Sequence, residues 1–168
     1  RLLPPVKAVR HRKPGASRLA TARVLAKERS GGAHRYVRLL GLAARDSATL
    51  LAQIRAGLGY RAFEQLRRHL GLSPEAFALL VAIKPRTLAR RRQEGRFSAE
   101  ESDRLLRASR IFSGALDLFE GDAKAARAWL ARPAPALGGA TPVSIAGTDF
   151  GAREVENLIG RLEHGVFS

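Results

Sequence analysis

Residues 71–95 read GLSPEAFALLVAIKPRTLARRRQEG, and this stretch decides the fold class of the chain. Its start, Ser73-Pro74-Glu75, places a hydroxyl cap, a proline at the first helical position and an acid in the first turn. These signals predict a short helix over Ser73–Val81. Pro85 opens a second helix, Pro85–Glu94, and the turn between the two helices is Ala82-Ile83-Lys84. Two short helices joined by a tight turn of this kind predict a helix-turn-helix.

The second helix of this pair carries the candidate DNA contacts, because the second helix of a helix-turn-helix can lie in the major groove. Arginine can bridge guanine O6 and N7, and threonine can meet a thymine methyl group or a phosphate. Leu88 is expected to face the core, opposite the polar face. The predicted DNA-binding residues are Lys84, Arg86, Thr87, Arg90, Arg91 and Arg92. A surface helix whose arginines are merely solvated is the alternative interpretation.

Helical signals continue on both sides of the pair. Upstream, Asp46 or Ser47 can cap a helix that reaches Gly57, and Tyr60–Leu70 is an amphipathic helix that stops at Gly71. Downstream, the predicted helix starts are the capping box Ser98–Glu101, Asp122 before Ala123–Ala131, Thr141-Pro142 and Thr148 or Asp149. No alternating β-branched run with a two-residue turn accompanies these helices, so the predicted fold class is all-α.

Two of the downstream helices have predicted buried faces. Trp129 and Leu130 are expected to be buried in the helix that follows Asp122. In the last helix, apolar residues recur at the i, i+3, i+4 and i+7 positions of one face. This stripe consists of Val155, Leu158, Ile159 and Leu162.

Charge is the first clue to a partner. The chain has 168 residues, with 30 Lys and Arg against 15 Asp and Glu, a net charge of +15. Residues 1–46 alone hold 12 basic and 2 acidic residues, a net charge of +10. We interpret them as a basic, partly disordered arm that contains proline and glycine. Such an excess favours a polyanionic partner, most often nucleic acid.

The composition also excludes several function classes. Without cysteine, the chain has no disulfide framework, no thiol nucleophile and no Cys-ligated zinc site. The four histidines stand too far apart in sequence for metal-ligand spacing, and no G-x-S-x-G elbow or phosphate-binding loop is present. We therefore expect no enzyme activity, no catalytic residue, no cofactor and no metal site. No apolar run reaches the length of a membrane span, which predicts a cytoplasmic protein.

The C-terminal segment is the second region of interest. It combines a Gly/Pro-rich loop, an amphipathic helix and the short tail His164–Ser168. One interpretation is a helix docked on its own domain with a frayed end, and the other is an element that inserts into a partner. Arg161 is expected to point away from the buried stripe, and its guanidinium suits carboxylate or phosphate-type recognition. The predicted partner-binding residues are Arg161, Glu163, His164, Val166 and Phe167.

From about Leu58 to Ser168 the chain resembles the Xre-type antitoxins of RES–Xre toxin–antitoxin systems. These proteins join an Xre-like helix-turn-helix to the toxin-binding domain also found in MbcA and ParS. The matching stretches are GLSPEAFALLVAIKPRTLARRRQEGRFSAEESDRLLR and DAKAARAWLARPAPALGGATPVSIAGTDFGAREVENLIGRLEHGVF. One departure is Lys84-Pro85, which stands where family members commonly have a serine-type residue before the recognition helix.

The resemblance implies a protein that neutralises a cognate toxin and, with that toxin, represses its own operon. RES toxins are thought to degrade NAD, and the antitoxin is expected to place its C-terminal region at the toxin's active-site cleft. On this basis we expect a DNA-binding domain over residues 47–112, a toxin-binding domain over residues 113–168 and a homodimer on operator DNA.

Two other readings stay open at this point. A stand-alone transcriptional regulator could use its C-terminal domain only to dimerise. An RNA-binding basic protein would explain the charge but not the capped pair of helices. A toxin reading frame beside the gene would favour the antitoxin.

Overall fold

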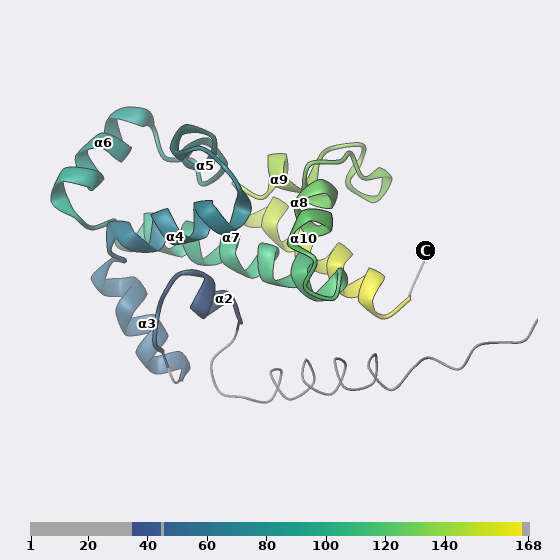
Figure 1. Ribbon diagram of the computed structural model, residues 1–168, viewed down its shortest axis with the longest axis horizontal. Helices are drawn as coiled ribbons and strands as arrows, with labels where there is room; N and C mark the ends of the chain where they lie inside the picture. The colour runs from purple at the N-terminus through teal and green to yellow at the C-terminus, as the bar shows by residue number, and fades with distance from the viewer. Residues whose placement is uncertain (1–34, 45, 166–168) are drawn as a thin grey trace, which may run out of the picture. The chain divides into compact units, whose positions relative to one another are not determined.

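The computed structural model describes residues 35–44 and 46–165. Within these two ranges the backbone forms helices and one isolated antiparallel bridge, Gly59 with Arg96, but no strand. The elements in chain order are α2 (Arg35–Leu39), α3 (Ser47–Ala56), α4 (Tyr60–Leu70), α5 (Pro74–Leu80), α6 (Pro85–Glu94), α7 (Ala99–Leu118), α8 (Ala123–Leu130), the 3-10 turn η1 (Pro135–Leu137), α9 (Pro142–Ile145) and α10 (Asp149–Glu163). The predicted all-α class is confirmed (Figure 1).

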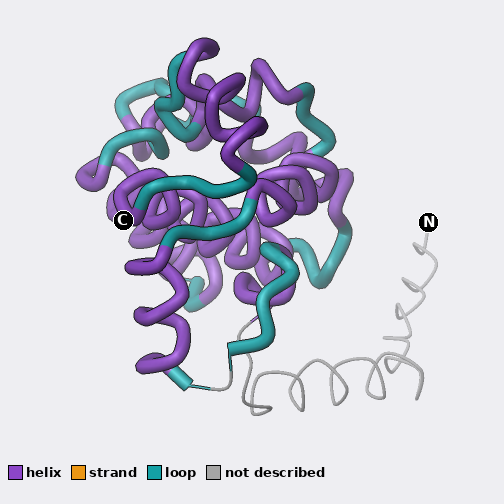
Figure 2. The backbone as a smooth tube through the Cα atoms, turned by 90° about the vertical axis from the view of Figure 1, so that its left-hand side faces the viewer, coloured by secondary structure: helices purple, strands orange, loops and turns teal. Residues whose placement is uncertain are grey.

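The helices begin where the sequence places their caps. The carboxylate of Asp46 accepts a hydrogen bond from the Thr49 N–H at 2.7 Å. At the start of α7, Ser98 Oγ accepts from the Glu101 N–H at 3.2 Å, and the Glu101 carboxylate accepts from the Ser98 N–H at 2.8 Å. These bonds satisfy backbone donors that have no partner inside the helix. Local sequence therefore sets these helix starts. Figure 2 shows the loops that join the helices.

The long helix α7 is the element to which the others attach. It packs against α2, α3, α8 and α10, and Figure 1 shows α4 and α10 running beside it. Small residues on α7 allow this close packing, because Gly114 lies where an added Cβ would sit 3.2 Å from the Ile159 side chain of α10. The buried Ser102 hydroxyl accepts from the Leu58 N–H at 2.8 Å and donates to the Ser98 carbonyl at 2.6 Å. One helix thus supports both the helix-turn-helix and the C-terminal elements.

A cluster of aromatic rings holds the helix-turn-helix to the rest of the core. The ring centroids of Phe63 and Phe77 lie 4.8 Å apart, and those of Phe63 and Phe97 lie 5.7 Å apart. Tyr60 stacks on Phe97 at 5.7 Å. The cluster joins α4, α5 and the segment that connects α6 to α7.

The packed part of the chain begins earlier than the sequence predicted. Residues 1–34 and the tail residues Val166 and Phe167 lie outside the described residues, but Arg35–Leu39 forms α2 on α7. Val37 and Leu40 are only 1 % exposed, and Arg35 pairs with Asp117 at 2.9 Å. The basic composition of residues 1–46 obscured this short apolar segment, whose burial depends on a surface far away in sequence.

Two residues of the predicted core lie at its edge. Trp129 is half-buried rather than buried, with its ring 6.4 Å from that of Phe119, because Ala126 and Leu130 take the core-facing positions of the short helix α8. Leu162 is also half-buried, since it lies in the last turn of α10, beyond the end of the buried stripe.

Candidate functional site

The turn between α5 and α6 sets the direction of the second helix. Ser73 Oγ caps α5 by accepting from the Ala76 N–H at 3.1 Å. After α5 ends, Ala82 adopts a φ of +52°, a left-handed conformation that costs a non-glycine residue about 1 kcal/mol or more. Compensation comes from the next residue, because the Ile83 N–H donates to the Ala78 carbonyl at 2.8 Å and the Ile83 side chain is buried. The hydrogen bond and the burial of the Ile83 side chain therefore stabilise the turn.

Helix α6 is held to the body of the protein by few contacts. Lys84 is its N-cap without a side-chain hydrogen bond, and Pro85 occupies its first turn, as the sequence predicts. Leu88 is the one residue of α6 that is buried. Thr87 and Arg91 are half-buried, and the other side chains of this helix are exposed.

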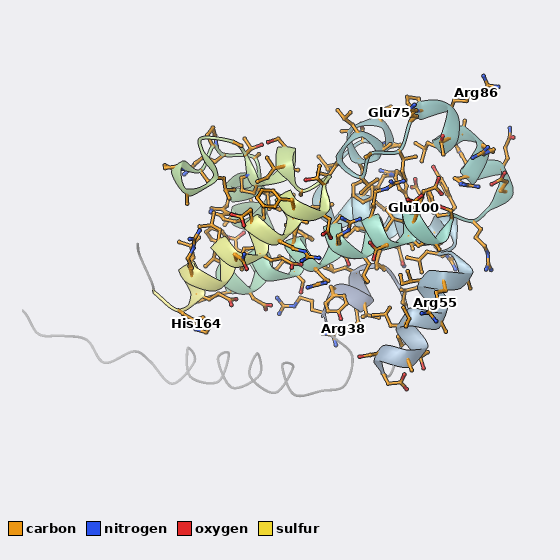
Figure 3. All side chains as sticks on the ribbon, turned by 180° about the vertical axis from the view of Figure 1, so that it is seen from behind. Arg38, Arg55, Glu75, Arg86, Glu100 and His164 are labelled. Carbon is orange, nitrogen blue, oxygen red and sulfur yellow. The ribbon has the colours of Figure 1, made fainter. Side chains whose placement is uncertain are left out.

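The structure separates the six predicted DNA-binding residues into four groups, the last of which is Arg91 alone. Arg86 and Arg90 are exposed on the outward face, and Figure 3 shows Arg86 projecting from one end of the described helices. Thr87 is half-buried beside them. Lys84 and Arg92 line a hollow of about 1290 Å³ between α4, α5 and α6. Arg86, Arg90 and Arg92 are thus the arginines of this set that are exposed.

Arg91 differs from the expectation that it shares this outward face. Its guanidinium donates to both carboxylate oxygens of Glu101 on α7, at 2.7 Å and 3.2 Å, and to Glu94 at 2.6 Å. The Arg91 side chain is 18 % exposed and that of Glu101 is 8 % exposed. A partly buried, bidentate pair of this kind orients α6 against α7, so Arg91 is a positioning residue.

The electrostatics of Glu101 follow from this pair. Burial by itself would raise the pKa of the Glu101 carboxyl. The hydrogen bonds from Arg91 and from the Ser98 N–H outweigh burial, so the pKa lies below its ordinary value. Sequence reasoning identified Glu101 only as half of a capping box. Its second role could not be predicted from spacing, because Arg91 stands on a different helix.

The second candidate surface lies on α10. Thr148 Oγ1 caps this helix by accepting from the Gly151 N–H at 3.0 Å. On one side α10 is buried against α7, and it is also tied to α7 by the Arg107–Asp149 and Arg110–Glu156 pairs at 3.4 Å and 3.1 Å. Its buried residues are Gly151, Ala152, Val155, Leu158 and Ile159. The opposite side of α10 is free of the protein's own core.

The described partner-binding candidates lie on this open side or beyond the end of the helix. Arg161 points away from the buried stripe and is exposed, as expected, and Glu163 and His164 are exposed as well. His164 ends α10 as its C-cap. Figure 3 places His164 and Arg86 at opposite ends of the described helices, so the two candidate surfaces do not compete for the same space.

Among residues 35–44 and 46–165, no group of three or more His, Cys, Asp or Glu side chains could hold a metal ion. No helix in the described part of the chain is both long and apolar enough to span a membrane.

Comparison with known proteins assigns both regions. Residues 49–110 match the Antitoxin Xre-like helix-turn-helix domain, and residues 115–165 match the Antitoxin Xre/MbcA/ParS C-terminal toxin-binding domain. Antitoxin Xre of Yersinia enterocolitica is 39 % identical over 132 residues, which cover 78 % of this chain and 89 % of that protein. Antitoxin Xre of Photorhabdus laumondii is 35 % identical over 132 residues, with the same coverage. The chain therefore belongs to the Xre family of antitoxins.

Proposed function

We propose that this antitoxin neutralises a cognate RES-type, NAD-degrading toxin with its C-terminal segment and represses its own operon through α6. The observation that carries the proposal is the pair of exposed helix faces, on α6 and α10, attached to one supporting helix. The family match supports the two general roles, and the type of toxin and the repression are the parts that need an experiment.

The DNA-binding part of the proposal rests on the outward face of α6. Arg86 and Arg90 lie one helical turn apart and are exposed. Each guanidinium can bridge two acceptors of a guanine edge. Thr87, Lys84 and Arg92 then contribute contacts to phosphates or to the groove wall, and Arg91 holds the helix in place. A homodimer would present two such helices to two half-sites about one turn of DNA apart.

The toxin-binding part rests on the end of α10. Arg161, Glu163 and His164 are exposed there, and the tail continues with Val166 and Phe167. We propose that the Arg161 guanidinium forms a charged contact inside the toxin's cleft and that the two apolar tail residues anchor it. The functional division of the chain would then be a DNA-binding domain over residues 47–112 and a toxin-binding domain over residues 113–168, preceded by the basic arm.

Gel shifts test the DNA-binding part. The antitoxin is titrated onto the DNA upstream of its own gene and onto a scrambled duplex, with Arg86→Ala, Arg90→Ala and, as a matched control, Arg153→Ala, an exposed arginine on α10. The two α6 variants should lose about 1–3 kcal/mol of binding to the upstream DNA and much of their preference for it. Equal losses in all three variants would contradict the assignment of α6.

Calorimetry tests the toxin-binding part. The partner is the product of the toxin reading frame beside the antitoxin gene, titrated with Arg161→Ala and with a chain that ends at Glu163. Both should bind at least tenfold more weakly and melt like the parent protein. Loss of NAD in cells that express this toxin, prevented by the antitoxin, would identify the RES chemistry. Unchanged affinity in both variants would leave the segment as a frayed helix end.

A further inference from the structure

Most of the exposed residues of α10 lie on one stripe along the helix. Residues spaced three or four positions apart share one face of a helix. The stripe, which runs opposite to the buried face, contains Phe150, Arg153, Asn157, Arg161 and His164. The residue proposed to meet the toxin, Arg161, is therefore one member of a surface that continues toward the start of the helix, about 16 Å from Phe150 at 1.5 Å per residue.

Phe150 is the large apolar side chain of this stripe, and it is 76 % exposed. Its backbone is held firmly. Thr148 caps the helix, Asp149 pairs with Arg107 and with Arg153 at 3.4 Å and 3.0 Å, and a Cβ on Gly151 would meet the carbonyl of Ile145. An aromatic ring presented on a rigid backbone loses little entropy on binding, which is typical of the anchor residues of interfaces.

Gly160 is a second, independent sign of a partner on the same face. Glycine is unfavourable inside a helix compared with alanine. Two other helical glycines have reasons inside the chain, because a Cβ on Gly114 would crowd Ile159 and one on Gly151 would meet Ile145. A Cβ on Gly160 would meet nothing within 4 Å. Space left open beside Arg161 lets a partner approach the backbone of α10 closely.

We propose that the cognate toxin docks along the whole outward stripe of α10, with Phe150 in an apolar pocket of the toxin and with close contact at Gly160. The inference rests on the proposed function and extends its contact surface beyond the tail. The toxin is favoured as the occupant because the stripe lies within residues 115–165, which match a toxin-binding domain, and is continuous with Arg161. Carboxylates on the toxin would face Arg153 and Arg161.

Calorimetry with the toxin encoded beside the gene tests the docking surface. Phe150→Ala and Gly160→Ala should each bind at least tenfold more weakly than the parent antitoxin. The matched control is Leu79→Ala, which removes an 82 % exposed apolar side chain from α5 and should bind the toxin unchanged. Gly160→Ala gives a sharp signature, since alanine should raise the Tm of the free antitoxin while lowering its affinity for the toxin.

Three results would overturn the inference. Parent-like affinity of both Phe150→Ala and Gly160→Ala, with tight binding by the parent protein, would restrict the contact to the tail and leave the proposed function intact. Conversion of a dimer to a monomer by these variants, without loss of toxin affinity, would assign the stripe to a second copy of the chain. Absence of toxin binding by the parent protein would instead refute the proposed function itself. Retained binding to the upstream DNA shows that each variant is folded.

Discussion

Helices α6 and α10 both present an exposed face, but they are held in place by different forces. α6 buries Leu88 and is oriented by the ion pair between Arg91 and Glu101. α10 buries five residues and adds two ion pairs to α7. The difference teaches that the orientation of α6 depends on charge and on a strained turn, whereas that of α10 depends on apolar packing. Lowering the pH should therefore disturb the orientation of α6 more than that of α10. Substitutions that create cavities should instead disturb the packing of α10 more than that of α6.

The two helices nevertheless share one support. Glu101 lies in the first turn of α7, and Gly114 lies near its other end, against Ile159. A fragment that ended after α7 would expose the apolar face that α10 covers. The two regions matched by separate family models are thus parts of one folding unit over the described residues, so point variants separate their roles better than truncations do.

The largest expected effect on stability comes from a substitution that breaks the packing of α10. Ile159→Ala should lower the free energy of unfolding by about 2–5 kcal/mol, because it removes a buried side chain that fills the space above Gly114. Urea unfolding measures the change, and Leu51→Ala, at a 48 % exposed position of α3, is the control. A loss below about 0.5 kcal/mol would show that α10 is not held by this contact.

The next largest effect comes from removing the ion pair that orients α6. Arg91→Ala leaves the Glu101 carboxylate buried without its guanidinium, which should cost about 1–3 kcal/mol of stability. DNA binding should fall as well, although Arg91 does not face the groove, and toxin binding should not change. Arg91→Lys restores charge without the two-pronged fork and should recover only part of the loss. Equal loss of DNA and toxin binding would contradict a role confined to α6.

A pH series sharpens the comparison. Because the pKa of Glu101 is lower in the folded protein than its ordinary value, its pair with Arg91 contributes stability above the ordinary pKa, near 4.3, and this contribution is lost as the pH falls through the folded pKa. Glu64, whose pKa is lowered by its hydrogen bond with Arg67, acts in the same direction.

Glu101→Gln should therefore show a smaller loss of Tm between pH 5 and pH 3 than the parent protein, on the order of a few degrees. Thermal melts at a series of pH values measure it, with Glu100→Gln, an exposed neighbour, as the control. Parallel pH profiles of Glu101→Gln and the parent protein would contradict the contribution of this carboxyl.

The smallest effect concerns the cap of α6. Lys84→Ser adds a hydroxyl acceptor where the N-cap now makes no side-chain hydrogen bond. The substitution should stabilise the protein by about 0.5–1 kcal/mol, and at the same time weaken DNA binding if the Lys84 ammonium contacts phosphate. Chemical unfolding and gel shifts on the same samples separate the two. Lower stability of this variant would mean that the Lys84 stem packs more tightly than its exposure indicates.

Local sequence by itself determined the helix boundaries and much of the functional prediction. Caps such as Ser73, Ser98 and Thr148 act within three residues of themselves, so their hydrogen bonds follow from spacing alone. Pro85 likewise predicts the start of α6, and helical periodicity predicts the apolar stripe of α10. The sequence also carried the family resemblance, which the comparisons confirmed.

Tertiary structure decided which side chains remain open to partners. The periodicity of α6 places Arg91 beside Arg90, and only the position of α7 brings Glu101 within 2.7 Å and removes Arg91 from the outward face. In the sequence, Val37 and Leu40 belong to a basic segment, and only packing against α7 buries them. Exposure of Phe150 and the empty space at Gly160 likewise depend on what packs nearby. Contacts between residues distant in sequence are set by packing, and spacing along the chain does not encode them directly.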